Sequence, residues 1–104
     1  MPQNQVYRFH IGLHATGEFN NPQAVAHRKA AAIRIMREYI PDGFTVTDTT
    51  GYWNDTIEPS LVVEAITAQT LPAGVICHQL CTQLHQECVF VTTSAVETAW
   101  IKAQ

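Results

Sequence analysis

The chain has 104 residues and a formal net charge of -3, and charged residues make up 14% of it. This length favours a single domain over residues 1–104. The chain has six Lys and Arg residues, which are too few for the basic surface with which proteins bind nucleic acid. No apolar run approaches the roughly 20 residues that cross a bilayer, and the N-terminus lacks a secretory signal pattern, so we expect no membrane partner and a location in the cytoplasm.

A half-buried strand is predicted over residues 6–14, because apolar and polar residues alternate there. The apolar positions expected to face the core are Tyr7, Phe9, Ile11 and Leu13. A helix follows, with Asn21 as its N-cap and Pro22 in its first turn, and it runs to about Tyr39. The residues expected on its buried side are Val25, Ala32, Ile33, Met36 and Ile40.

Two strands joined by a tight turn come next. Residues 44–53 alternate and are rich in threonine, and a polar turn at Asn54 and Asp55 leads to a strand over residues 58–65. On this strand one face carries Pro59, Leu61, Val63 and Ala65, which we expect in the core. The other face carries Glu58, Ser60, Val62 and Glu64.

A second helix is predicted from Ala73 to about His85. Its apolar side carries Ile76, Cys77, Leu80, Cys81 and Leu84. A last strand covers residues 88–93, and residues 95–101 either extend the sheet or close it against a neighbouring chain.

The order strand, helix, strand, strand, helix, strand predicts an α+β fold, a ferredoxin-like two-layer sandwich. Both helices must bury their apolar sides on the same face of one antiparallel sheet. The other face then has no helices, and we expect another subunit to cover it. Sites in such oligomers often form where two subunits meet, because the cleft there is concave and partly dry.

Three stretches carry a family resemblance. The run Thr47–Trp53 (TDTTGYW), the glutamate Glu58 that opens the next strand, and Gln86–Val91 (QECVFV) after the second helix resemble the small phage enzymes that cleave S-adenosylmethionine. The similarity spans about residues 27–101 in the same order and includes the pair His27-Arg28. This family is known as the SAM lyases, formerly the SAM hydrolases.

The resemblance implies a homotrimer with active sites between subunits. It further implies that S-adenosyl-L-methionine is split into methylthioadenosine and L-homoserine lactone without a cofactor or metal. The substrate's own carboxylate attacks the carbon that bears the sulfonium, and the reaction removes the methyl donor of host restriction and modification systems, which is an anti-restriction role. Hydrolysis of the same substrate is the alternative reaction.

The same resemblance nominates the site residues. Glu58 is the expected catalytic carboxylate, which holds the substrate's ammonium or ribose hydroxyls, or activates water if the reaction is a hydrolysis. Tyr52 is the expected catalytic aromatic residue, and either its ring or that of Trp53 faces the adenine or the sulfonium. The other substrate-binding candidates are Trp53, Thr49, Ser60, Glu64 and Gln86.

Two other classes of function stay open at the level of sequence. A non-enzymatic ferredoxin-like oligomer that binds a metabolite or a protein partner is the main alternative, since this fold hosts many activities. A hydrolytic metalloenzyme that uses His10 and His14 is a third, although strand spacing separates their Cα atoms by roughly 13 Å. Cys77 and Cys81 lie on an apolar helix side, so buried thiols are favoured over zinc ligands.

Overall fold

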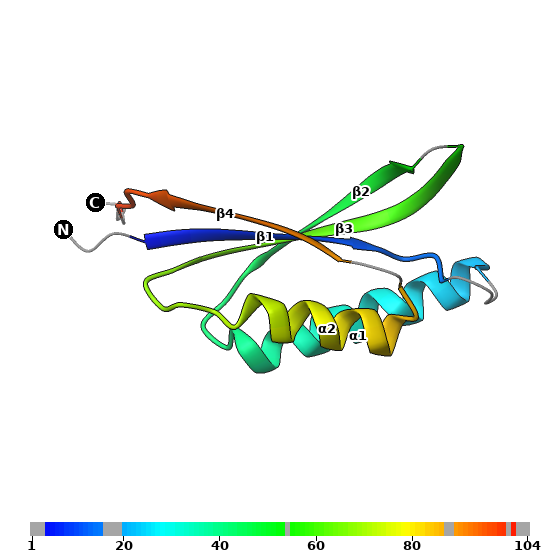
Figure 1. Ribbon diagram of the computed structural model, residues 1–104, viewed down its shortest axis with the longest axis horizontal. Coiled ribbons are helices and arrows are strands. Elements are labelled where there is room, and N and C mark those ends of the chain that lie inside the picture. Colours follow the sequence, from blue (N-terminus) through cyan, green and yellow to red (C-terminus); the bar gives the residue numbers. More distant parts are fainter. Residues whose placement is uncertain (1–3, 16–19, 54, 87–88, 100, 102–104) are drawn as a thin grey trace.

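The computed structural model describes residues 4–15, 20–53, 55–86, 89–99 and 101. In chain order the elements are β1 (Asn4–Gly12), α1 (Pro22–Tyr39), β2 (Thr45–Trp53), β3 (Thr56–Thr67), α2 (Ala73–Leu84) and β4 (Phe90–Val96). The strands form one antiparallel sheet in the order β2-β3-β1-β4. Both helices cover the same face of this sheet (Figure 1). The predicted ferredoxin-like α+β sandwich is therefore confirmed.

Helix α1 begins where the sequence predicts it. The Asn21 side chain accepts a hydrogen bond from the backbone N–H of Ala24 at 2.8 Å, and Pro22 occupies the first turn. After the helix, Gly43 takes a φ of 133°, which an L side chain rarely adopts. The buried side of the helix is Ala32, Ile35 and Met36, so the assignment of Ile33 to the core was wrong and Ile35 takes that place.

The core lies between the two helices and the inner face of β1 and β3. Side chains that are almost completely buried include Phe9, Ile11, Ile35, Met36, Leu61, Val63, Ile76, Leu80 and Leu84. Burial of one such side chain contributes about 1.5–3 kcal/mol, so this cluster holds the two layers together. The helices also contact each other through the Tyr39 hydroxyl, which donates to Gln79 Oε1 at 2.6 Å. Neither α1 nor α2 combines the length and the hydropathy that a membrane-spanning helix requires.

Several strand ends differ from the sequence prediction, and β3 (Thr56–Thr67) extends beyond the predicted residues 58–65 at both ends. Strand β1 stops at Gly12 rather than at His14. The Leu13 N–H still bonds to β3, but the Leu13 carbonyl and the His14 N–H bond to side chains instead. Strand β4 continues to Val96 rather than ending at Thr93. The predicted residues Asn54 of the turn and Cys88 of the last strand lie outside the described residues.

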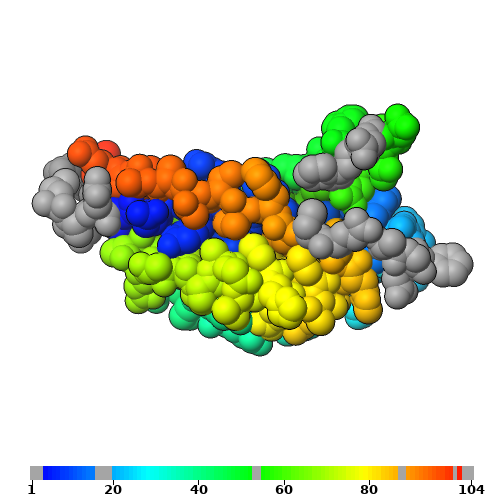
Figure 2. Space-filling view, in the orientation of Figure 1, coloured from blue at the N-terminus to red at the C-terminus, as the bar shows by residue number. Residues whose placement is uncertain are grey.

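No helix of the described residues covers the sheet face opposite α1 and α2, and we call it the open face. Register and alternation place on it Arg8, His10 and Gly12 from β1, Thr45, Thr47 and Thr49 from β2, Glu58, Ser60, Val62 and Glu64 from β3, and Phe90 and Thr92 from β4. The β2–β3 hairpin bends away from the helical layer at its tip, as Figure 2 also shows. Near this tip Tyr52 of β2 and Ile57 of β3 are exposed.

Candidate functional site

Glu58 lies near the start of β3, where the ends of three segments come together. Its Oε2 atom accepts a hydrogen bond from the backbone N–H of His14 at 3.2 Å. Its Oε1 atom lies over Gly12, the last residue of β1, beside the side chain of Gln86. We call Gly12, His14, Glu58 and Gln86 the Glu58 cluster. The cluster is half-buried, so a ligand can reach it.

The backbone of residues 13–15 supports this cluster. The Leu13 N–H donates to the Pro59 carbonyl at 2.9 Å, which continues the contact between β1 and β3 by one residue. The Leu13 carbonyl accepts a hydrogen bond from Arg28 Nη1 at 2.8 Å. The same Arg28 nitrogen donates to Asn20 Oδ1, and that oxygen also accepts from the Ala15 N–H, both at 2.8 Å. The segment is thus tied to β3 and to α1, which fixes the N–H that holds Glu58.

Gln86 reaches the cluster because of how α2 ends. His85 adopts the left-handed conformation with a φ of 54°, and the Gln86 N–H donates back to the Cys81 carbonyl at 3.0 Å. The Gln86 side chain then extends to β1, and its Nε2 donates to the His14 carbonyl. With Nε2 used in this way, Gln86 Oε1 is left as an acceptor next to Glu58 Oε1. Two acceptor oxygens side by side suit a ligand that carries N–H or O–H donors.

Thr49 and Ser60 lie next to the cluster on the open face. Ser60 pairs with Gly12 on one side and with Thr49 on the other, so these residues form a row across β1, β3 and β2. The Ser60 hydroxyl donates to the Glu58 carbonyl at 3.5 Å. The structure therefore brings four sequence-predicted site residues together: Thr49, Glu58, Ser60 and Gln86.

Tyr52 and Glu64 lie away from this group within one chain. Tyr52 pairs with Ile57, so it occupies the sheet side opposite Glu58, at the hairpin tip where its side chain is 73% exposed. Glu64 shares the open face with Glu58 but lies six residues further along β3, roughly 20 Å away at the rise of a strand. Its carboxylate forms an ion pair with Arg8 at 2.7 Å. Trp53 ends β2 and pairs with Thr56 in the register.

The described residues bring no group of three or more His, Cys, Asp and Glu side chains into a geometry that could hold a metal ion. His10 contacts Phe90, with ring centroids 5.2 Å apart, while His14 lies beyond the end of β1. Cys77 is a free thiol that packs partly against the core. Desolvation by burial, and then the nearby Cys81, raise the pKa of Cys77 above its ordinary value. A neutral, half-buried thiol of this kind is a poor nucleophile.

Sequence reasoning missed three features of the site. The His10–Phe90 ring pair lies on the open face, where His10 is the residue of β1 that precedes Gly12 on the same side of the sheet. The Phe90 side chain is 55% exposed. Gly12 and Arg28 also received no role. An isolated glycine inside an alternating strand pattern often marks a close approach of another group, so Gly12 carried a readable signal.

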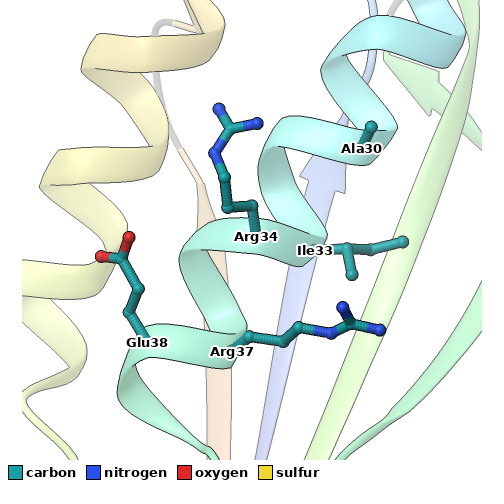
Figure 3. Close-up of a pocket in the computed structure, with 5 residues that line it drawn as sticks. All are labelled: Ala30, Ile33, Arg34, Arg37 and Glu38. Atoms are coloured by element: carbon teal, nitrogen blue, oxygen red, sulfur yellow. The ribbon is translucent and has the colours of Figure 1, made fainter.

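Two hollows lie away from the cluster. One, of about 880 Å³, lies at the far end of the sheet, between the α1–β2 and β3–α2 connections, where Phe44, Glu64, Ile66 and Leu71 are among the residues that line it. The other is formed by Ala30, Ile33, Arg34, Arg37 and Glu38, all from α1, as the close-up in Figure 3 shows. Neither is lined by a residue of the Glu58 cluster, so both are separate from this site.

Comparisons with known proteins place the fold. No protein-family model matches the chain, and no curated protein matches its sequence. Among solved structures, a phage SAM lyase in the apo state is similar with a TM-score of 0.56 and 13% identity, covering 98% of this chain and 95% of the other. A phage SAM lyase in complex with S-methyl-5'-thioadenosine gives 0.51 and 16%, covering 95% and 93%.

A third similar structure is CPII, a nitrogen regulatory PII-like protein from Thiomonas intermedia K12, bound to ADP, AMP and bicarbonate. It has a TM-score of 0.53 and 11% identity and covers 94% of this chain and 97% of the other. The expected resemblance to phage SAM lyases is thereby confirmed in the fold, over nearly the whole of both chains. Identities this low show a shared fold alone.

Proposed function

We propose that this protein cleaves S-adenosyl-L-methionine to methylthioadenosine and L-homoserine lactone, with Glu58 at the centre of the site. In a phage-infected cell this reaction would deplete the methyl donor of restriction and modification systems. The observation that carries the proposal is the Glu58 cluster itself. The glutamate nominated by resemblance to the SAM lyases has a carboxylate bonded to the His14 N–H and lies beside Gln86, another nominated residue.

The chemistry asks little of the protein's own groups. The substrate carboxylate attacks the carbon that bears the sulfonium, a C–O bond forms as the C–S bond breaks, and the electron pair of that bond passes to sulfur. A five-membered lactone and a neutral thioether result, and no proton has to move. Holding the substrate in the bent conformation is then the main contribution, and well-oriented intramolecular reactions gain about 7–11 kcal/mol in this way.

Charge determines where Glu58 helps most. The attacking carboxylate and the departing sulfonium cancel their charges as they react, so a carboxylate pressed against the sulfonium would stabilise the ground state more than the transition state. In our proposal Glu58 Oε1 and Gln86 Oε1 instead accept hydrogen bonds from the substrate's ammonium or ribose hydroxyls. At about 5 Å and an effective dielectric of 20, a carboxylate and an ammonium attract by roughly 3 kcal/mol before desolvation.

The aromatic component of the site would come from a neighbouring subunit. Tyr52 is exposed at the hairpin tip and lies on the side of the sheet opposite Glu58. A site shared between subunits of a homotrimer would allow Tyr52 or Trp53 of one chain to face the Glu58 cluster of the next. The open face, with Ile66 at 52% and Phe90 at 55% exposure, supports such an assembly. In this proposal Glu64 would remain a weaker contributor from its ion pair with Arg8.

A second candidate function rests on the likeness to the PII-like protein, whose TM-score falls between those of the two SAM lyase structures. In this alternative the chain is a non-enzymatic oligomer that binds a small metabolite. Turnover separates the two functions, since a binding protein raises its Tm with ligand and leaves the ligand intact.

The test is to incubate the purified protein with S-adenosylmethionine in heavy-oxygen water that contains a chelator, and to follow the products by mass spectrometry. The lyase reaction gives methylthioadenosine and unlabelled homoserine lactone at early times. Label in the first homoserine formed would instead indicate hydrolysis with Glu58 as the general base. Intact substrate together with a ligand-dependent rise in Tm would favour the binding protein.

A further inference from the structure

Gly12 is the point over which the two acceptor side chains of the Glu58 cluster meet. A Cβ atom placed on Gly12 would lie 2.5 Å from Glu58 Oε1 and 2.9 Å from Glu58 Cδ. The same atom would lie 2.9 Å from Gln86 Oε1. Distances below 3.0 Å are ones that real Cβ atoms essentially never show. The carboxylate and the amide therefore occupy the volume that any other residue at position 12 would fill.

The need for glycine here is spatial and not conformational. Gly12 lies in extended backbone at the end of β1, and among the described glycines positive φ is found at Gly43. Gly74, in the first turn of α2, has no atom within 4 Å of its would-be Cβ. A methyl group at position 74 therefore meets open space, whereas a methyl group at position 12 meets the site. This difference makes Gly74 a matched control.

We propose that Gly12 is a positioning residue, which keeps open the space that sets where the Glu58 carboxylate and the Gln86 amide lie. The atoms that a new Cβ would meet are the far ends of flexible side chains, so they can move while the backbone stays in place. A methyl group at position 12 would thus leave the fold intact and displace the carboxylate from the His14 N–H. Within the proposed reaction, a misplacement of about 1 Å can cost on the order of 10²-fold in rate.

The kinetic part of this inference rests on the proposed function. We expect Gly12→Ala to lower kcat by about 10²-fold with a much smaller change in KM, and Gly74→Ala to keep the wild-type kcat. A kcat for Gly12→Ala within about threefold of wild type would overturn the positioning role. A fall in kcat without a matching change in KM is what separates this role from a merely structural one.

A second measurement does not depend on any activity. The Tm values of wild type, Gly12→Ala, Glu58→Ala and the double variant form a cycle that reports whether the two positions are coupled. We expect Gly12→Ala to raise the Tm by a few degrees in the Glu58→Ala background, where alanine suits a strand better than glycine, and to raise it less or lower it when Glu58 is present. A Gly12→Ala protein that folds only in the Glu58→Ala background gives the same answer. Equal shifts in both backgrounds, or no folding in either, would overturn the inference even if the wild type cleaves S-adenosylmethionine.

Discussion

The Glu58 carboxylate and the His14 backbone N–H form a hydrogen bond of 3.2 Å between residues 44 positions apart in the sequence. The His14 carbonyl in turn accepts a hydrogen bond from the side-chain amide of Gln86, which lies 72 positions after His14 in the sequence. One residue thus joins the start of β3 to the end of α2. A carboxylate held by a backbone N–H keeps one oxygen fixed and leaves the other to a ligand.

Arg28 should stabilise the backbone segment that supports the Glu58 cluster. Its Nη1 atom bonds the Leu13 carbonyl and Asn20 Oδ1, so Arg28→Ala removes a charged donor from both. We expect a loss of about 1–3 kcal/mol in the free energy of unfolding, together with a drop in kcat. Urea unfolding and steady-state kinetics measure the two effects. Arg34→Ala, an exposed position on the same helix, is the matched control, and an equal effect of both variants would refute the role.

The N-cap of α1 gives a prediction that separates stability from activity. Asn21→Ala removes the hydrogen bond to the Ala24 N–H and should cost about 1 kcal/mol, while kcat stays at the wild-type value. For a chain of this size that is a fall in Tm of roughly 4–8 °C. Asn21→Asp keeps an acceptor and should retain most of the stability. A thermal scan in which the two variants melt together would contradict the cap.

The contribution of α2 to the core can be measured at Leu80, whose side chain is completely buried. Leu80→Ala should destabilise the fold by about 2–5 kcal/mol through lost burial and the cavity left behind. Val75→Ala, on the exposed side of the same helix, should change stability by less than about 1 kcal/mol. Chemical denaturation of both variants makes the comparison, and similar losses would mean that α2 does not pack as described.

Cys77 should make stability fall at alkaline pH. Its pKa is raised in the folded protein by burial and by Cys81, so the unfolded chain loses this proton first. The stabilising contribution is therefore complete below the ordinary pKa of 9.0 and is lost as the pH rises from there through the raised value. Tm values from pH 7 to 10.5 should fall less steeply above pH 9 for Cys77→Ala than for wild type. Parallel curves would exclude this contribution.

The order and type of every element could be predicted from the sequence, because periodicity and capping are local signals. The Asn21 cap and the threonine-rich alternation of β2 are examples. Local patterns were less reliable in showing which residues of a helix lie on its buried side when apolar residues are adjacent in the sequence. Ile33 follows Ala32 directly and is apolar, but the buried side of α1 turns through Ile35 and Met36 instead.

The site was only partly readable from the sequence, since its contacts are nonlocal. Alternation correctly put Glu58 and Glu64 on one face, and the rise of a strand separates them by roughly 20 Å, but neither could show which residues of other elements would surround Glu58. The alternation of Leu13 and His14 continued the β1 pattern, yet the side chains of Glu58, Gln86 and Arg28 end the strand there. Only the folded chain shows that Gly12 lies under two acceptor side chains.

The most direct test of the proposed function compares wild type with Glu58→Gln, a change that keeps the size of the side chain and removes its charge. Both proteins, matched by circular dichroism and Tm, would be mixed with S-adenosylmethionine, and methylthioadenosine would be measured over time. We expect steady formation by wild type and none above the uncatalysed rate with Glu58→Gln. Equal rates for the two proteins would contradict the role of Glu58, and the absence of methylthioadenosine with wild type would contradict the proposed reaction itself.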